Sequence, residues 1–390
     1  MIGSRTILAS VLLLATAGGC GTSPAPPDDV VSALAEHGDE IATAVESFCP
    51  VETDADGHIV AVDLTNRQLS SRGLQRIAQL SKLRRLYLSS PTLDEQGLES
   101  LNNCPALETL WITNANLDAH AWQTLGSLKQ LKRLKLSSSP LAANSLDQLA
   151  RLSQLEFLDL ASTGLADAEL APLSQLSHLQ TLVLDQGRLG DKAVGALAAI
   201  TSLRRVSLNA MAIGDVTLKS LAGLPQLRHL ELSGTQVTDA GMAHLVTMSH
   251  LERLSLNNTG VTDSGLQTLS TRDSLTHLDL QDLKISEAGC RSLSEIENLV
   301  ELRLNGCPIG DKSVEVLSRL ENLELLNLNR TRVSDAGLAT LHGHKSLKII
   351  YVETTAASAE AVAKLVTALP GCRVVSGTSI GLPDPGASSR

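Results

Sequence analysis

Aromatic residues are scarce in this sequence, whose 390 residues include only two each of Trp, Tyr and Phe. Hydrophobic residues nevertheless make up 43% of the chain, so its core must be built from aliphatic side chains. A short unit that repeats its leucines at a fixed period is one way to build such a core. Because a repetitive array grows without needing a second core, length alone does not fix the number of domains here.

Positive charge is also in short supply. Lys and Arg number 32 against 42 Asp and Glu, which gives a formal net charge of -10 at neutral pH. No run of basic residues breaks this pattern. Because an acidic excess repels phosphate backbones, we expect no nucleic acid among the partners.

Sequence patterns of common cofactor sites are missing as well. The chain has no P-loop and no Gly-x-Gly-x-x-Gly, so no phosphate or dinucleotide cradle is expected. The close histidine pair His342 and His344 ends a helical segment, with His344 at a core position, which argues against a metal site. We therefore expect no catalytic residues, no bound metal and no small-molecule cofactor.

The cysteines follow no disulfide or zinc pattern. Six are present, and none forms a Cys-x-x-Cys arrangement. Apart from Cys20 an odd number remains, so at least one is free or pairs with another molecule. Cysteine also suits a buried apolar position, and whether any pair forms stays open for Cys49, Cys104, Cys290, Cys307 and Cys372.

The N-terminal residues contain an apolar stretch that is too short to span a membrane. Arg5 precedes this stretch, residues 7–16, and residues 17–20 read Ala-Gly-Gly-Cys. The ending resembles a bacterial lipobox, which implies a signal peptide over residues 1–19, lipid attachment at Cys20 and a tether over residues 20–28. An ordinary secretory signal is the alternative. We expect an exported protein, anchored by lipid to a bacterial membrane and facing the periplasm or the cell surface.

A pattern of the form Leu-x-x-Leu-x-Leu recurs at a constant step of 24 residues. Thirteen copies fill residues 59–370 without an insertion, and chance does not produce such a register. Alternate residues of a strand point to the same side, so each copy predicts a short strand with one buried face. The first members of the copies are Ile59, Leu83, Leu107, Leu131, Leu155, Leu179, Leu203, Leu227, Leu251, Leu275, Leu299, Leu323 and Leu347.

A helical half follows each predicted strand. Leucines three residues apart, such as Leu218 and Leu221, mark one face of a helix. An acidic residue such as Asp239 precedes most of these pairs, and we expect it to satisfy free N–H groups of its own helix. Small residues keep the first turn narrow where neighbouring repeats crowd, at Gly241, Gly265, Gly289 and Gly337.

The complete unit resembles the leucine-rich repeats of the ribonuclease-inhibitor-like and cysteine-containing classes. Residues 237–242 (VTDAGM) and 333–338 (VSDAGL) carry the match best. The resemblance covers about residues 59–376. It implies an α/β solenoid, a horseshoe with a parallel sheet on the concave side and short helices on the convex side. Where the family often has Asn or Cys, three residues after the last strand leucine, this chain has mainly Thr and Ser, with Pro91, Met211 and Leu283 as exceptions.

The two ends differ from the repeats. Residues 29–58 predict an N-terminal cap of amphipathic helix and a hairpin, in which residues 51–53 pair back on the first repeat strand. The hairpin turn, residues 54–57, reads Asp-Ala-Asp-Gly but lacks the later ligands of a calcium loop, so we interpret it as a plain turn. Residues 371–376 take the next strand position as a C-terminal cap, and residues 377–390 are expected to be disordered.

Two columns of strand side chains face the concave surface, where the core does not need them. Four of the six aromatic residues fall in these columns. Large rings on an open face suggest contact with a partner, although aromatics also suit strands in general. The best candidate for a binding patch consists of Tyr87, Trp111, Arg133, Lys135 and Phe157.

A basic stripe continues the outer of these columns, at Arg205, His229, Arg253 and His277. One interpretation is a site for an anion or an acidic partner, which Arg205, His229 and Arg253 would contact. The other, which we favour, is a lattice of ion pairs in which each Arg meets a carboxylate on the next strand.

These patterns predict a non-enzymatic binding module at the cell envelope. Its concave face would recognise a protein, peptide or glycan, and the lipid anchor would be its only contact with the membrane. A spacer or scaffold without a specific ligand is the alternative. The identity of the ligand, the membrane leaflet and the oligomeric state stay open.

Overall fold

The computed structural model describes residues 41–377, except residues 66, 68, 90–94, 143 and 166–169. Its strands form one open sheet in chain order, in which β1 is antiparallel to β2 and each later pair is parallel. The strands are β1 (Val51–Thr53), β2 (Ile59–Leu64), β3 (Arg85–Ser89), β4 (Thr109–Thr113), β5 (Arg133–Lys135), β6 (Phe157–Asp159), β7 (Thr181–Val183), β8 (Arg205–Ser207), β9 (His229–Glu231), β10 (Arg253–Ser255), β11 (His277–Asp279), β12 (Glu301–Arg303), β13 (Leu325–Asn327), β14 (Ile349–Tyr351) and β15 (Arg373–Val375).

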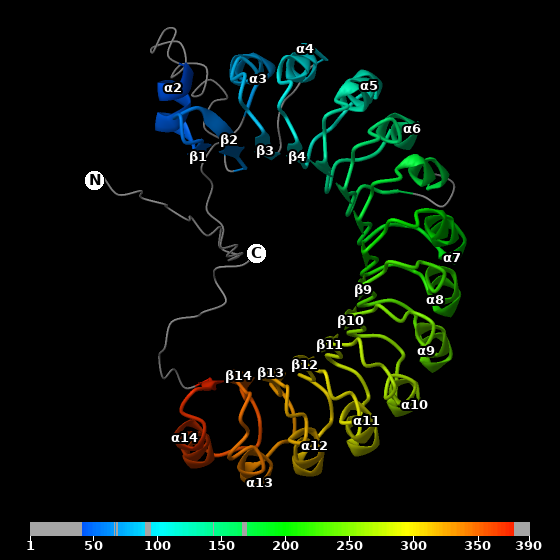
Figure 1. The fold of residues 1–390 in the computed structure, drawn as a ribbon, viewed down its shortest axis with the longest axis vertical. Coiled ribbons are helices and arrows are strands. Elements are labelled where there is room, and N and C mark those ends of the chain that lie inside the picture. The colour runs from blue at the N-terminus through cyan, green and yellow to red at the C-terminus, as the bar shows by residue number, and fades with distance from the viewer. Residues whose placement is uncertain are drawn as a thin grey trace, which may run out of the picture.

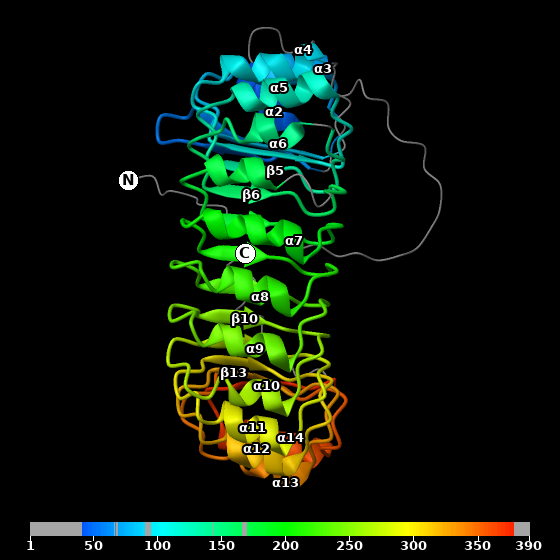
Figure 2. The ribbon, with the colours of Figure 1, turned by 90° about the vertical axis from the view of Figure 1, so that its right-hand side faces the viewer.

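Helices cover the outer side of this sheet, and the strands line the inner side of an arc (Figure 1). Seen from the helical side, the helices stack in one row along the molecule (Figure 2). Strands stack about 4.8 Å apart whereas packed helices need about 8–10 Å, so the array must bend with its strands inside. This architecture confirms the predicted α/β horseshoe. The helical elements are α2 (Ile41–Phe48), α3 (Ser71–Ile77), α4 (Glu95–Glu99), η1 (Ser100–Asn103), α5 (Ala119–Ser127), α6 (Ser145–Leu149), η2 (Ala171–Gln175), α7 (Asp191–Val194), η3 (Gly195–Ala199), α8 (Asp215–Leu221), α9 (Asp239–Leu245), α10 (Asp263–Gln267), α11 (Glu287–Leu293), α12 (Asp311–Leu317), α13 (Asp335–Ala339) and α14 (Ala359–Ala368).

The 24-residue step of the sequence reappears as the register of the sheet. Leu254 of β10 pairs with Leu230 of β9 and with Leu278 of β11. Leu254 is 2% exposed, whereas Arg253 beside it is exposed on the opposite side of the pleat. The buried aliphatic residues of successive repeats form one continuous core. A single strand and helix could not close such a core, so each repeat depends on its neighbours.

The acidic residues at the helix starts bind differently from the expectation. Asp239 begins α9, yet its carboxylate accepts hydrogen bonds from the next repeat, from Thr262 N (2.7 Å) and Thr262 Oγ1 (2.6 Å). Within α9 itself, the N–H of Ala240 is accepted by the Thr238 hydroxyl. The carboxylate therefore bonds the extended backbone of the following repeat, whereas the hydroxyl of Thr238 caps α9. The same cross-repeat bond is made by Asp215, Asp263, Asp311 and Asp335.

The side chains three residues after the last strand leucine mostly hydrogen-bond to the backbone of their own repeat and so close a turn. Thr235 Oγ1 donates to Leu232 O at 2.6 Å, and other threonines of the column make the same bond. Cys307 Sγ instead donates to Leu280 O of the preceding repeat at 3.1 Å. The exceptions Met211 and Leu283 are buried in the core, and Pro91 lies outside the described residues.

An antiparallel hairpin begins the sheet, because β1 pairs with β2. In its turn, Asp54 Oδ1 accepts hydrogen bonds from Asp56 N (3.0 Å) and His58 N (2.9 Å), the arrangement of an Asx turn. Residues 1–40, which include Cys20, the tether and the start of the expected cap, lie outside the described residues, as do residues 378–390. No helix in the described part is long and apolar enough to cross a membrane.

The cysteines of the described residues are buried and free: Cys49, Cys104, Cys290, Cys307 and Cys372. Burial raises the pKa of the Cys290 thiol to about 12. A thiol is nucleophilic only as the thiolate, so Cys290 contributes to packing and not to chemistry at neutral pH.

Candidate functional site

The concave face carries the predicted site residues in direct register across neighbouring strands. Tyr87 of β3 lies opposite Trp111 of β4, which lies opposite Lys135 of β5. Arg133 of β5 lies opposite Phe157 of β6. These five residues form one group, the aromatic patch. The basic stripe, farther along the sheet, is a second group of consecutive neighbours, Arg205, His229, Arg253 and His277.

Rings and cations contact one another within the aromatic patch. The Tyr87 and Trp111 rings meet edge to face, with centroids 4.7 Å apart and an interplanar angle of 72°. Lys135 Nζ lies 5.5 Å from the centroid of the Trp111 ring, and the guanidinium carbon of Arg133 lies 4.4 Å from that of Phe157. Each cation–π contact at such a site stabilises by about 0.5–1 kcal/mol, which favours these side-chain positions only modestly.

The polar groups of the patch are unequally satisfied. Lys135 Nζ pairs with Asp159 Oδ2 at 3.0 Å. Arg133 is exposed and contacts no carboxylate within the described part of the chain. Trp111 Nε1 is buried and lacks an acceptor there, whereas Nε1 of the core residue Trp122 donates to Leu117 O. The patch therefore presents a guanidinium that is held on a ring while its hydrogen-bond donors are unused.

The basic stripe is an ion-pair lattice at one end only. Arg205 Nη2 reaches Glu231 Oε1 on the next strand at 2.6 Å. Arg253 is exposed and pairs with no carboxylate among the residues that the structure describes. The carboxylate that precedes it in the chain, Glu252, pairs with Arg228 instead. The lattice prediction is therefore right for Arg205 and wrong for Arg253, which pairs with no described carboxylate although Asp279 lies on the next strand.

Two histidines flank Arg253 across the sheet. Burial lowers the pKa of His229, and the positive charges of Arg253 and Arg205 lower it further. Burial also lowers the pKa of His277, with the charge of Arg253 as the next cause. Both imidazoles therefore lose their proton at a lower pH than a solvent-exposed histidine does.

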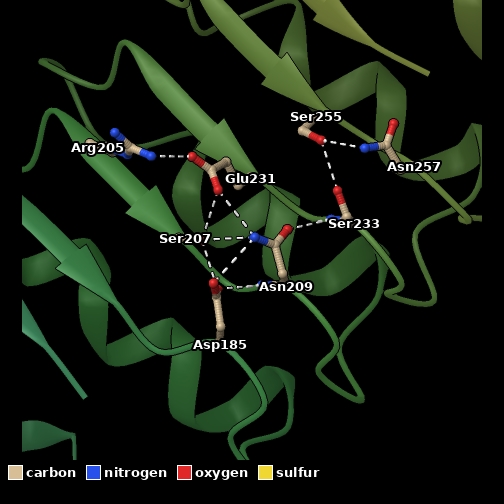
Figure 3. A network of polar contacts seen from close by, with 8 residues as sticks. All are labelled: Asp185, Arg205, Ser207, Asn209, Glu231, Ser233, Ser255 and Asn257. Atoms are coloured by element: carbon tan, nitrogen blue, oxygen red, sulfur yellow. Dashed lines mark hydrogen bonds and ion pairs between the residues drawn. The ribbon is translucent and has the colours of Figure 1, made fainter. Parts of the chain in front are cut away.

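A polar network that the sequence analysis missed lies beside the stripe (Figure 3). Ser207 Oγ lies 2.7 Å from Asp185 Oδ1 and 3.1 Å from Glu231 Oε2, so its single proton is shared between, or alternates between, two carboxylates. Asn209 Nδ2 lies between the same carboxylates, 3.3 Å from Asp185 Oδ2 and 3.1 Å from Glu231 Oε2. Figure 3 shows these side chains converging from neighbouring repeats. The network fixes the position of Glu231, and thereby of its partner Arg205.

The sequence does carry a signal for this network, in the column one residue beyond the last strand leucine. Asn209 Oδ1 accepts the N–H of Ser233 at 2.8 Å, and Asp185 Oδ1 accepts the N–H of Asn209 at 2.8 Å. Asn257 and Asn329 make the same bond to the residue 24 positions later. Side chains thus extend the hydrogen bonding of the sheet past the ends of the short strands, which is a structural role.

Comparison with known proteins agrees with this repeat geometry. The profile of the family described as leucine-rich repeat region matches residues 82–370. The chain belongs to the leucine-rich repeat family. A search of curated protein sequences finds no match.

A solved structure of an internalin shows the same fold. An internalin, InlF, from Listeria monocytogenes aligns with a TM-score of 0.52 at 17% sequence identity, covering 92% of this chain and 99% of that one. A second Listeria internalin, InlC2, aligns with a TM-score of 0.40 at 25% identity, covering 57% of this chain and 80% of its own. At 17% identity the likeness to InlF concerns the fold alone.

Two other features were candidates for chemistry, a hollow near the C-terminal repeats and a Gly-x-Ser-x-Gly pattern. A hollow of about 540 Å³ near the C-terminal end of the repeats is lined in part by His344, Lys348 and Leu369. His344 Nε2 lies 3.0 Å from Leu320 O, and its Nδ1 accepts hydrogen bonds from the N–H groups of residues 346 and 347. Both ring nitrogens are therefore hydrogen-bonded to backbone groups. A Gly-x-Ser-x-Gly pattern occurs at residues 377–381, and its Ser379 lies outside the described residues.

Replacing Asp185 by Asn is expected to change how stability depends on pH. Burial raises the pKa of Asp185 in the folded protein. A carboxyl group of this kind stabilises the fold while protonated, and that stability is lost as the pH rises through its folded pKa. Asp185→Asn has no carboxyl group to ionise at this position. As the pH rises from about 4 to about 7, the free energy of unfolding of the variant should therefore increase relative to that of the parent. Urea unfolding at both pH values measures the gain, and an unchanged difference between the proteins would contradict the prediction.

Proposed function

We propose that this chain is a non-enzymatic binding module of the cell envelope that recognises a protein or peptide through its concave face. The aromatic patch is the observation that carries the proposal. A chain with six aromatic residues keeps three of them, Tyr87, Trp111 and Phe157, close together on an exposed sheet. Trp, Tyr and Arg are the residues enriched in the energetic centres of protein interfaces. Membership of the leucine-rich repeat family supports the same role.

The contacts within the patch favour a protein or peptide over a glycan. Sugar rings stack on open aromatic faces, but Tyr87 and Lys135 flank Trp111 from the two neighbouring strands. Arg133 likewise covers Phe157. The N–H donors of exposed Arg133 remain for a ligand, and these suit the carbonyl and carboxylate groups of a polypeptide.

The N-terminal residues support a place at the envelope. Residues 17–20 end a short apolar stretch with small residues and a cysteine, which suits lipid attachment at Cys20 after cleavage. One acyl chain binds a membrane weakly, whereas two or more anchor it stably. The repeats would then face the periplasm or the cell surface from a short tether.

Metabolic labelling with an alkyne fatty acid tests the anchor. The full chain should take up the label and sediment with membranes, and Cys20→Ser should lose both properties. A matched change, Cys49→Ser, alters a buried cysteine of the described part and should leave the label in place. Equal labelling of all three proteins would refute the lipid anchor.

Crosslinking in the envelope followed by mass spectrometry tests the binding function. The full chain should capture a defined protein that is lost when Tyr87, Trp111 and Phe157 are all changed to Ala. Capture of a glycan would keep the binding site but overturn the partner class. If the parent and the triple variant recover the same proteins, a spacer or scaffold is favoured instead.

A further inference from the structure

A three-residue basic cluster lies in the middle of the concave sheet. His229 of β9, Arg253 of β10 and His277 of β11 pair strand to strand. Because parallel strands lie about 4.8 Å apart, the backbones of the two histidines are about 10 Å apart with that of Arg253 between them. The side chains of His229 and His277 are 33% and 23% exposed, and Arg253 is exposed. All three side chains are therefore accessible from the groove.

Most of the carboxylates around this cluster are engaged by other side chains, but Asp279 Oδ1 is buried and has no hydrogen-bond partner among the described residues. The two histidines approach Glu252 and Glu301 only at 3.8 Å, a distance too long for a good hydrogen bond. Asp279 Oδ2, in the inner column, accepts a bond from Gln281 Nε2 at 2.9 Å. The remaining ion pairs join neighbouring side chains and leave Arg253 out: Arg205 with Glu231, Arg228 with Glu252, and Arg303 with Glu301.

We propose that His229, Arg253 and His277 bind one oxyanion, a carboxylate or a phosphate, carried by a ligand of the concave face. A guanidinium offers two parallel N–H donors that match two oxygens of such a group. A protonated imidazole on each side adds a further charged donor. The site deepens the proposed function, because it names a group that the partner carries. A free anion can occupy it without that partner.

Binding at this site depends on pH. Burial and the charge of Arg253 lower the pKa of both imidazoles, and an anion bound among them offsets that positive charge. The anion therefore raises both pKa values, and by reciprocity the affinity for the anion rises as the pH falls. The other charged groups facing the histidines are those already named on β8, on β12 and ahead of β10, namely Arg205, Glu252, Glu301 and Arg303.

Histidine hydrogen–deuterium exchange with mass spectrometry measures the pKa of each imidazole in the full chain. Sulfate and acetate serve as probes for phosphate and carboxylate, at matched ionic strength. The better probe should raise the pKa of His229 and of His277 by about 0.5 each. Two such rises correspond to anion binding about tenfold tighter well below both pKa values than well above them. A stronger response to sulfate indicates a phosphate ligand, and a stronger response to acetate indicates a carboxylate ligand.

Arg253→Gln separates this site from general screening. Without an anion, the variant should raise the pKa of both histidines, because a repelling charge is gone. With the anion, the further rise should be absent. The control Arg291→Gln removes an equal charge from α11, where Arg291 pairs with Glu287, and should respond like the parent.

Two results would overturn the site: an anion response that is equal in the parent and in Arg253→Gln, or no response in either. A response confined to proteins with Arg253 supports the site even if no partner is captured. Failure of the proposed function is thus not mistaken for failure of the anion site.

Discussion

Replacing Trp111 by Ala is expected to weaken binding of the concave-face partner by about 100-fold, an effect of about 2–3 kcal/mol. Trp111 is the centre of the aromatic patch, with Tyr87 on one neighbouring strand and Lys135 on the other. Truncation removes the ring and also the support that holds both neighbours in place. Tyr87→Ala or Phe157→Ala should cost less, because each ring has a single described contact within the patch.

Affinity of the crosslinked partner for immobilised parent and variant chains measures this effect. Trp111→Phe keeps a ring and loses Nε1, so it should retain most of the affinity if the ring carries the energy. Val246→Ala is a matched control on the convex side, where Val246 is 47% exposed. An affinity for Trp111→Ala within threefold of the parent would remove the patch from the interface.

Stability has to be measured alongside binding, because Trp111 is half-buried. Its truncation also removes apolar contact from the edge of the core, at about 25 cal/mol per Å². The repeats on either side retain their own buried leucines, so we expect the variant to fold. A loss of affinity in an unfolded variant would say nothing about the partner. The thermal unfolding curve shows whether the variant is folded when its affinity is measured.

Much of the fold followed from the period alone. With a constant step of 24 residues, all thirteen strands can bury their leucines only if each strand lies beside the next in the same register. Leu230, Leu254 and Leu278 therefore had to be neighbours, and so did Tyr87, Trp111 and Lys135 in the exposed column. The sequence could thus predict which side chains share the concave face.

The sequence could not predict which partner each polar side chain selects. Arg205 and Arg253 occupy equivalent positions, and among the described residues only Arg205 pairs with a carboxylate, that of Glu231, which Ser207 and Asn209 also contact. Asp239 could satisfy its own helix or the following repeat, and the structure shows that it bonds the following repeat, as Asp215 does where Gly214 offers no capping side chain. Such choices are decided by small differences in geometry that a linear pattern does not contain.

Gly337→Ala is expected to lower the free energy of unfolding by about 2–4 kcal/mol. A Cβ at this position would lie 2.5 Å from Asp311 Oδ1, 2.9 Å from Val333 Cγ1 and 3.0 Å from Asp311 Cα. Overpacking costs about 1–3 kcal/mol, and displacing the carboxylate also weakens its bonds to Ser334 N (2.7 Å) and Ser334 Oγ (2.6 Å). The gain in helix propensity from Gly to Ala is only about 1 kcal/mol, so the clash outweighs it and the net effect is destabilising.

Denaturant unfolding of Gly337→Ala beside Gly195→Ala tests this account. A Cβ at Gly195 would have only Ser220 Oγ within 4 Å, at 3.8 Å, so that variant should be neutral or slightly stabilised. Adding Asp311→Ala to Gly337→Ala should recover part of the loss, because the methyl group then has room. A coupling energy below about 0.5 kcal/mol in the double-mutant cycle would show that the clash with Asp311, in the preceding repeat, is not what destabilises Gly337→Ala.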